Sequence, residues 1–256
     1  MPTVTRGDVS LYYEDGGKGF PVLFHTGGGG DGRMWHLAGY LDRLAGYRHL
    51  VLDHRGHGRS DCPEELDAHR MGEYVADVVA VLDDAQVERA VLLGYSGGAS
   101  VLYRVAATHP ERCAALIGIG SVPEPDDDST TDSPMAAHLR EVGVRALMEE
   151  FAAAESEPAP AWLIDNLATT ETEMFALLLE AWAELSGAWE LFPNMTAPTL
   201  LVAGEEEQVD GAADRAAAQL PNGRAAVLPG YGHLQAFWHE EITGPLITDF
   251  LRSLGL

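Results

Sequence analysis

The chain has 256 residues, of which 46% are hydrophobic and 22% charged, a composition that suits one large α/β domain or two small ones. Its formal net charge of −24 repels nucleic acid and anionic membrane surfaces, so we expect neither as a partner. The polar start (MPTVTRGDVS), the lack of any apolar run of about 20 residues and the two cysteines predict a cytoplasmic protein without signal peptide, membrane span or disulfide framework.

Apolar runs of strand length alternate with segments of helical periodicity along most of the chain. We expect strands at Thr3–Arg6, Val9–Glu14, Pro21–His25, His49–Asp53, Ala90–Leu93, Ala114–Gly120, Thr199–Ala203 and Ala225–Leu228. We expect helices at Trp35–Leu44, Met71–Asp84, Ala99–Thr108, Gly211–Leu220 and Pro245–Leu254. Strands that alternate with helices predict an α/β fold, with a doubly wound, mostly parallel sheet and helices on both faces.

The segment 122–193 interrupts this alternation. It opens with an acidic, turn-rich run (PEPDDDST) and continues with helical periodicity at His138–Phe151, Trp162–Leu167 and Glu171–Trp189. A helical insertion after the sixth strand would lie over the carboxyl ends of the strands, where such sheets bind ligands. We therefore expect a core domain of residues 1–121 and 194–256 and a helical cap domain of residues 122–193.

The turn after the strand at Ala90–Leu93 matches the pattern G-x-S-x-G, with Gly94, Ser96 and Gly98. A serine at a sharp turn from strand to helix adopts a strained backbone that exposes its hydroxyl, and flanking glycines avoid clashes. The N-terminus of the following helix favours an oxyanion. The simpler interpretation is a glycine-serine turn, but the strand before and the helix after favour Ser96 as a nucleophile.

A serine nucleophile needs a base, and the base needs a carboxylate to orient it. His233 lies in a glycine-rich loop directly after the last expected strand, and the acidic run 205–210 (EEEQVD) follows the seventh. The resulting chain order is serine, acid, histidine. In addition, Gly27–Gly30 follow the strand Pro21–His25, and consecutive glycines let a backbone approach a ligand closely and direct amides at it.

At this point the chain resembles the α/β-hydrolase fold family, of the kind with a helical cap after the sixth strand. The matching segments are GYSGG, HTGGGG, DHRGHGRSD, and GEEEQVD followed by PGYGH. The resemblance implies that Ser96 is the nucleophile and His233 the base. It also implies that Gly97 donates one N–H to the oxyanion and that Gly27, or next to it Gly28, donates the other.

The chain departs from the family pattern at two places. The family usually has His-Gly where this chain has HT, which leaves the second oxyanion donor open. The family acid, commonly aspartate, lies three residues after the glycine that closes the seventh strand, and here this position is Glu207. Asp210 on the same loop and Glu124 after the sixth strand are the alternative acids.

Several other residues have competing interpretations. His54 and His57 have a spacing found in metal sites, but they lie in a turn without a third ligand nearby, so we expect structural turn residues. His25 is expected to support the oxyanion loop. We expect the larger apolar residues of the cap to form its core, with one or two lining the pocket: Trp162, Trp182, Trp189, Met174 and Phe175.

Together these features predict a serine hydrolase that cleaves a carboxylic ester or lactone of a small, apolar molecule through an acyl-enzyme. No cofactor and no metal are expected, and the chain is expected as a monomer or homodimer. Serine at the elbow argues against haloalkane dehalogenases and epoxide hydrolases. The same residues would also serve C–C bond or amide hydrolysis or a perhydrolase activity. A ligand-binding receptor with a vestigial triad is the alternative from another class.

Overall fold

The computed structural model describes residues 2–122, 133–183, 189–207 and 211–256. Within them, eight strands form one sheet in the order β1-β2-β4-β3-β5-β6-β7-β8. The strands are β1 (Thr3–Arg6), β2 (Val9–Gly17), β3 (Pro21–His25), β4 (Arg48–Leu52), β5 (Ala90–Tyr95), β6 (Cys113–Ile119), β7 (Thr199–Gly204) and β8 (Gly223–Leu228). Both β1 and β4 pair antiparallel to β2, and all other pairs are parallel. The predicted mostly parallel sheet is confirmed.

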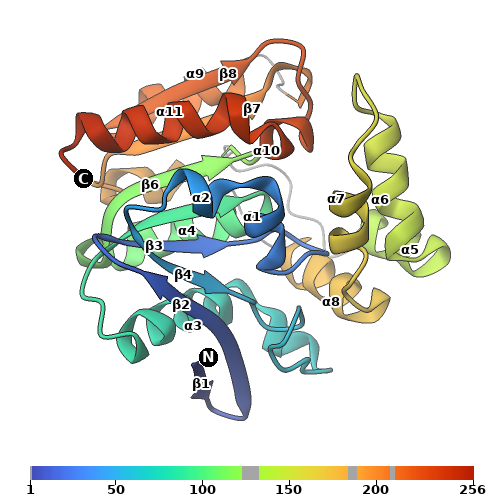
Figure 1. Cartoon of the computed structure of the whole chain (residues 1–256). Helices are drawn as coiled ribbons and strands as arrows, with labels where there is room; N and C mark the ends of the chain where they lie inside the picture. Colours follow the sequence, from blue (N-terminus) through green and yellow to red (C-terminus); the bar gives the residue numbers. More distant parts are fainter. Residues whose placement is uncertain (1, 123–132, 184–188, 208–210) are drawn as a thin grey trace.

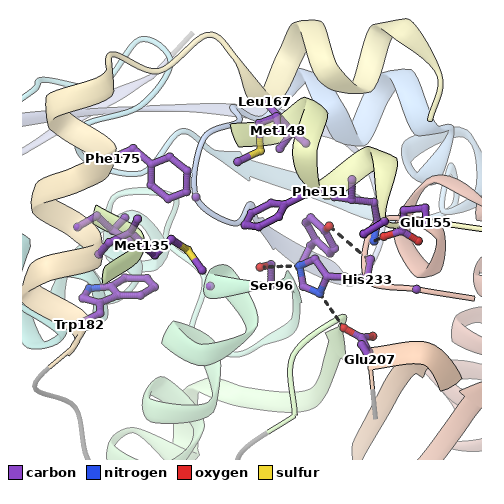
Figure 2. A pocket seen from close by; sticks show the side chains of 18 of the residues that line it. Ser96, Met135, Met148, Phe151, Glu155, Leu167, Phe175, Trp182, Glu207 and His233 are labelled. Carbon is purple, nitrogen blue, oxygen red and sulfur yellow. Dashed lines mark hydrogen bonds and ion pairs between the residues drawn. The ribbon is translucent and has the colours of Figure 1, made fainter. Parts of the chain in front are cut away.

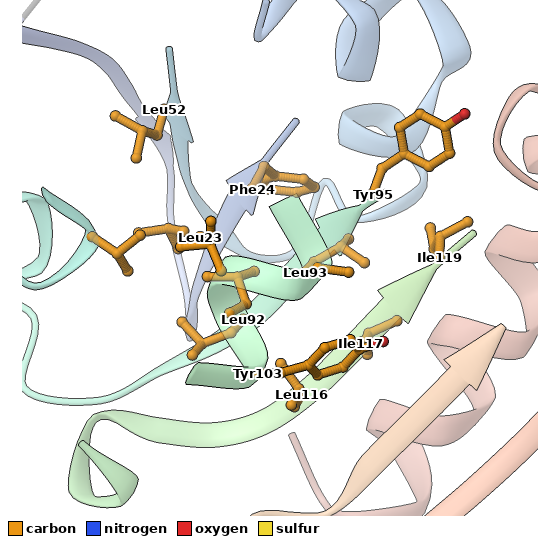
Figure 3. Close-up of a cluster of buried hydrophobic side chains, with 14 of the residues drawn as sticks. Leu23, Phe24, Leu52, Leu92, Leu93, Tyr95, Tyr103, Leu116, Ile117 and Ile119 are labelled. Carbon is orange, nitrogen blue, oxygen red and sulfur yellow. The ribbon is translucent and has the colours of Figure 1, made fainter. Parts of the chain in front are cut away.

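The centre of the sheet forms the core of the molecule. Every residue of β5, β6 and β7 is buried, as expected for strands covered on both faces. Neighbouring strands place apolar residues side by side, with Leu92 opposite Leu116 and Leu93 opposite Ile117. Figure 3 shows these side chains together with Phe24 of β3. Burial of each such side chain contributes about 1.5–3 kcal/mol to the free energy of unfolding. The packed core therefore holds the central strands in register and with them the positions of their ends.

Helices cover both faces of the sheet (Figure 1). One face carries α1 (Arg33–Ala38), α2 (Tyr40–Arg43) and α11 (Glu240–Ser253), with α11 packed against α2. The other carries α3 (Met71–Asp84), α4 (Gly97–Thr108) and α9 (Ala212–Gln219), with α3 packed against α4. This two-sided cover leaves the carboxyl ends of the parallel strands as the edge available for a site.

Among the described residues between β6 and β7, four α-helices precede the short 3₁₀ helix η3 (Trp189–Asn194): α5 (Pro134–Val142), α6 (Val144–Ala153), α7 (Ala161–Leu167) and α8 (Thr172–Ala183). In Figure 1 they stand beyond the end of the sheet to which the arrows of β3, β4 and β6 point. Within this group α5 packs against α8 and α6 against α7, while α7 also contacts α1 of the core. The helical insertion after the sixth strand is confirmed, and its limits at residues 122 and 193 stay a prediction.

Two predicted helices are each broken by a glycine. The helix expected at Trp35–Leu44 divides into α1 and α2 at Gly39, which has φ 93°. The helix expected at His138–Phe151 divides into α5 and α6 at Gly143, which has φ 82°. A side chain is strained in this left-handed region whereas glycine is not, so both glycines end a helix and begin the next.

The C-terminal region also differs from the prediction. The helix expected at Pro245–Leu254 begins earlier, at Glu240, and the short helix α10 (Gln235–Trp238) precedes it. Pro245 lacks the N–H that would bond the carbonyl of Glu241, and the helix nevertheless continues through it. The proline therefore lies inside α11 instead of marking its start.

Two further expectations concern the cysteines and membrane spans. Both cysteines are free, as the expected lack of a disulfide framework requires; Cys113 is buried at the start of β6, whereas Cys62 is exposed. Among the helices of the described residues, none has the length and apolar character that crossing a membrane requires. Burial raises the pKa of the Cys113 thiol to about 12, which disfavours the reactive thiolate form.

Candidate active site

Ser96 lies at the junction of β5 and α4, in a backbone conformation that side chains rarely adopt. Its φ is 52° and its ψ is −126°, and such a conformation costs on the order of 1–3 kcal/mol. A side chain at Gly94 would meet the backbone N of Ala99 at 2.6 Å, and one at Gly98 would collide with the carbonyl oxygen of Thr26. The strained turn and the need for both glycines agree with the predicted nucleophile elbow.

The structure brings Ser96, His233 and Glu207 into one chain of hydrogen bonds (Figure 2). Nε2 of His233 lies 3.0 Å from Oγ of Ser96, and Nδ1 lies 2.7 Å from Oε2 of Glu207. A carboxylate only accepts hydrogen bonds, so in the neutral imidazole Nδ1 carries the proton and Nε2 presents its lone pair to the serine hydroxyl. This is the tautomer that a general base needs.

Glu207 is held by the strand that precedes it. It ends the short 3₁₀ helix η4 (Glu205–Glu207) directly after β7, and its Oε1 accepts a hydrogen bond from the backbone N of Gly204 at 2.7 Å. One oxygen therefore orients the carboxylate while the other contacts the histidine. The alternative acids Asp210 and Glu124 lie outside the described residues, so the structure does not compare them with Glu207.

The three glycines proposed for the oxyanion hole lie around Ser96. A side chain at Gly27 would meet Cβ of Ser96 at 2.8 Å and its Oγ at 3.3 Å, so this backbone packs directly on the serine. The backbone N of Gly28 lies 3.8 Å from the position of a side chain on Gly97, the first residue of α4. The loop after β3 and the start of α4 thus converge beside the hydroxyl, and the choice of donors stays a prediction.

Two histidines contact the backbone of the loop after β3. Nε2 of His54 lies 3.1 Å from the carbonyl oxygen of Gly27, to which it can donate. Nε2 of His57 lies 3.0 Å from the backbone N of Gly29 and accepts from it. His54 and His57 were predicted to be structural turn residues, and this is confirmed. Their contacts to the glycine loop were missed, because spacing in sequence does not show which loop a buried ring faces.

Burial keeps these histidines uncharged. It lowers the pKa of His54 to about 4 and that of His25 to about 3, and it holds the pKa of His57 well below its ordinary value. The rings of His25 and His54 stack with centroids 5.1 Å apart. His25 contacts the carbonyl oxygen of Thr26 at 2.8 Å, which agrees with its predicted support of this loop.

A cavity of about 480 Å³ opens above Ser96. Its walls are mostly apolar side chains of the helical insertion, and Figure 2 shows several of them facing the serine. The apolar lining residues from the insertion are Met135, Met148, Phe151, Ala154, Leu167, Phe175, Leu178, Leu179 and Trp182. Of the residues predicted to form the core of the insertion, Phe175 and Trp182 line this cavity. The site therefore suits an apolar group close to the serine.

Metal ligation has no support in the part of the chain that the structure describes. No group of three or more His, Cys, Asp or Glu is arranged there to hold a metal ion. His54 and His57 instead have both ring nitrogens within hydrogen-bond distance of backbone atoms. The chemistry available in the described site is that of a hydroxyl, an imidazole and a carboxylate.

A family model described as the alpha/beta hydrolase fold matches residues 21–161, more than half of the chain. The chain belongs to the alpha/beta hydrolase family. Among the relatives of this alpha/beta hydrolase, a non-heme chloroperoxidase from Streptomyces lividans is 27% identical over 280 aligned residues, which cover 99% of this chain and 100% of that one. The relationship therefore extends from the nucleophile elbow to the histidine loop.

Solved structures of the same fold include hydrolytic enzymes. A thermophilic esterase from Thermogutta terrifontis has a TM-score of 0.82 at 24% identity, over 99% of this chain and 98% of that one. The enol-lactonase from Burkholderia xenovorans LB400 has a TM-score of 0.83 at 21% identity, over 98% and 100%. At such identities the likeness shows that this alpha/beta hydrolase shares their fold, insertion included.

Two neighbours of His233 in this alpha/beta hydrolase were missed from sequence. The hydroxyl of Tyr95 lies 3.4 Å from the carbonyl oxygen of His233, and its ring lies 5.2 Å from the imidazole. Its place directly before Ser96, at the end of a buried strand, was a usable signal. The second is Glu155, which follows α6 and lines the cavity. No local pattern marks it, because its partners lie about 80 residues later.

Proposed function

We propose that this alpha/beta hydrolase is a serine hydrolase that cleaves a carboxylic ester or lactone through an acyl-enzyme. The observation that carries the proposal is the chain of two hydrogen bonds from Glu207 through His233 to Ser96. The three side chains have the donor and acceptor order that moves a proton away from a hydroxyl. The esterase and the enol-lactonase of the same fold support the choice of an ester or lactone bond as the one that is cleaved.

In the proposed reaction, Nε2 of His233 takes the proton of Ser96 while Oγ attacks the substrate carbonyl carbon. The tetrahedral oxyanion accepts hydrogen bonds from backbone N–H groups of Gly97 and Gly27, with Gly28 as the alternative to Gly27. The imidazolium, stabilised by Glu207, returns the proton to the leaving alcohol. Water then attacks the acyl-enzyme with His233 again as the base, and the acid and free Ser96 are released.

The substrate is proposed to be a small molecule with an apolar group. The support is the cavity of about 480 Å³, whose walls are aliphatic, aromatic and thioether side chains from the insertion. We propose that residues 122–193 form a cap that shapes this cavity and limits the access of water to the acyl-enzyme. The core, residues 1–121 and 194–256, would supply the reacting groups.

Steady-state hydrolysis of p-nitrophenyl butyrate tests the proposal. We expect many turnovers by the wild type and loss of activity in Ser96→Ala and His233→Ala, with circular dichroism unchanged. A single release of nitrophenol per chain would instead indicate a ligand-binding protein with a vestigial triad. Activity that survives in Ser96→Ala would contradict the proposed nucleophile.

The chloroperoxidase relative supports a second candidate, perhydrolysis at the same serine. If hydrogen peroxide replaces water in the attack on the acyl-enzyme, the products are a peracid and free Ser96, and the peracid can oxidise a halide in solution. Bromination of monochlorodimedone in acetate with hydrogen peroxide measures this activity. We expect it to require Ser96, so bromination that persists in Ser96→Ala would contradict this route.

A further inference from the structure

Three consecutive residues of the insertion, 155–157, all contact the part of the core that carries His233. They follow α6, and their partners lie between the end of β8 and the start of α11. This is a second connection of the insertion to the core, separate from the contact of α7 with α1. Its partners include the residue directly after His233, so its effect on the imidazole can be argued from contacts.

Glu155 binds the backbone next to the histidine. Its Oε1 accepts from the N–H of Leu234 at 2.7 Å, and its Oε2 lies 3.4 Å from the N of Gln235. Leu234 is the N-cap of α10, and its side chain makes no cap hydrogen bond. Both residues are buried, and the first N–H groups of a helix have no partner within it. Glu155 supplies this acceptor from the helical insertion.

The carboxylate of Glu155 also packs on the residue before the histidine. Any side chain at Gly232 would collide with this carboxylate, so glycine is what lets the two approach. Glu155 therefore contacts Gly232 on one side of His233 and the N–H of Leu234 on the other. Figure 2 shows Glu155 close to the imidazole. Both residues that flank His233 in the chain are therefore in contact with Glu155.

The neighbours of Glu155 strengthen the same connection. Oγ of Ser156 lies 3.0 Å from both the carbonyl oxygen of Gly230 and Oε1 of Gln235, and it can donate to either. The same Oε1 of Gln235 accepts from the N–H of Gly232 at 3.1 Å. Glu157 pairs with Nε2 of His239, just past α10. The histidine loop is thus bonded to the insertion at its start, at its middle and after α10.

The core holds the opposite side of the same loop. Oε2 of Glu205 accepts from the N–H of Gly230 at 3.0 Å, and the hydroxyl of Tyr95 reaches the carbonyl oxygen of His233. The core contacts restrain the loop before the histidine and at its carbonyl. The peptide that follows His233 is therefore restrained from both sides, with its carbonyl oxygen contacted by Tyr95 of the core and its N–H bonded to Glu155 of the insertion.

We infer that Glu155 is a positioning residue, which aligns His233 with Ser96 and links the placement of the insertion to the competence of the base. The inference rests on the proposed function, since that function makes His233 the base. Glu155 touches backbone, not the reacting atoms, so its loss should lower the rate of proton transfer and leave the apolar cavity able to bind. An error of about 1 Å in such an alignment costs on the order of 10²-fold in rate.

The test compares Glu155→Ala and Glu155→Gln with Glu149→Ala, a matched loss of a carboxylate on α6 that lies 3.9 Å from Arg145. Glu155→Ala should lower kcat on p-nitrophenyl butyrate by about 10-fold or more with KM nearly unchanged. It should slow phosphonylation of Ser96 by a small fluorophosphonate to the same degree. Glu155→Gln keeps an oxygen for Leu234 and should recover most of the rate, while Glu149→Ala should match the wild type.

Amide hydrogen exchange of peptides that cover residues 230–239 makes the test independent of activity. Relative to the wild type, exchange there should be faster in Glu155→Ala, increased by a smaller factor in Ser156→Ala, and unchanged in Glu149→Ala. Unchanged exchange in Glu155→Ala, or a rise in KM alone with normal phosphonylation, would overturn the inference. A wild type that neither turns over esters nor reacts with fluorophosphonate would instead overturn the proposed function, whatever the exchange shows.

Discussion

At the scale of single residues, Glu207 is the member of the site whose role depends most on the structure. Its carboxylate lies 2.7 Å from Nδ1 of His233 and is itself held by the N–H of Gly204. We expect Glu207→Gln to lower kcat by about 10³-fold or more, because an amide can donate to Nδ1 and so stabilise the wrong tautomer. The measurement is hydrolysis of p-nitrophenyl acetate and butyrate at pH 7.5.

The two alternative acids provide the controls for this experiment. Asp210→Asn and Glu124→Gln remove one negative charge each, as Glu207→Gln does, and both should keep nearly the wild-type kcat. A variant at Glu207 with normal activity, together with a large loss in either of the other two, would transfer the role of the acid to that residue.

The buried histidines predict a pH dependence of stability. Burial lowers the pKa of His25 to about 3 and of His54 to about 4, and holds that of His57 far below the ordinary 6.5 or so of an unfolded chain. Below about pH 6.5 the unfolded chain takes up protons that the folded protein excludes. The free energy of unfolding is therefore greatest above that pH and falls with acidity, by up to about 1.4 kcal/mol per pH unit for each group.

Urea unfolding at pH 7.5, 6.5 and 5.5 measures this slope. We expect His57→Gln to reduce the slope, because one fewer histidine is then protonated only on unfolding. His138→Gln, at an exposed histidine, is the matched control, and the slope should fall more in His57→Gln than in this variant. Equal slopes in His57→Gln and the wild type would show that His57 is not held neutral by the fold.

At the scale of helices and strands, the sequence predicted most of the architecture from periodicity and turn residues. The buried strands such as β5 and the amphipathic helix α3 follow directly from their patterns. The breaks at Gly39 and Gly143 were missed, because the helical periodicity on either side continues through each glycine. The short helix α10 was also missed, since four residues are too few for a periodic pattern and its N-terminus is satisfied by the distant Glu155.

The break between α5 and α6 gives a prediction for stability. Gly143 has φ 82° and ψ 160°, and a side chain there would have its nearest neighbour at 3.9 Å, so the backbone conformation alone should oppose substitution. We expect Gly143→Ala to lower the free energy of unfolding by about 1–3 kcal/mol. The cost should appear as a lower urea midpoint with an unchanged m-value.

A second glycine to alanine change controls for this experiment. Gly72 lies in the first turn of α3, where a side chain would meet open space. Alanine favours the helix over glycine, so Gly72→Ala should be neutral or stabilise the protein by up to about 1 kcal/mol. Equal midpoints for Gly143→Ala and Gly72→Ala would contradict the assigned strain.

At the scale of the whole molecule, charge should restrict the substrate. The net charge is −24. Besides His233, the titratable side chains that line the cavity among the described residues are three carboxylates, those of Glu155, Glu206 and Glu207. Residues 123–132, 184–188 and 208–210 contain no Lys or Arg in their sequence. A substrate carboxylate about 5 Å from one such charge is disfavoured by on the order of 3 kcal/mol at an effective dielectric constant of about 20.

Two esters of matched size test this charge selection. The acyl groups of p-nitrophenyl butyrate and mono-p-nitrophenyl succinate differ mainly in a methyl group against a carboxylate. We expect kcat/KM for the succinate to be lower by about 100-fold at low salt, with a smaller ratio in 1 M salt, where the Debye length falls to about 3 Å. The methyl ester of the succinate should regain activity. Similar values for butyrate and succinate would contradict a role for charge.

The global features of the sequence were sufficient for the fold, but not for the way that the insertion meets the core. The alternation of strands and helices predicts the sheet, and the sheet brings the ends of β5, β7 and β8 to one edge. The contacts of Glu155 with Leu234 and of His57 with Gly29 join segments distant in the chain. Such pairs follow from packing in three dimensions, for which a single sequence gives no pattern.

For the whole molecule, the proposed function depends on Ser96 as the nucleophile. The most direct measurement is mass spectrometry of the chain after reaction with a small fluorophosphonate, followed by peptide mapping. We expect one phosphonyl group per chain, located on Ser96, and no labelling of Ser96→Ala or of chain denatured beforehand. A wild type that stays unlabelled, or a label on another residue, would contradict the claim.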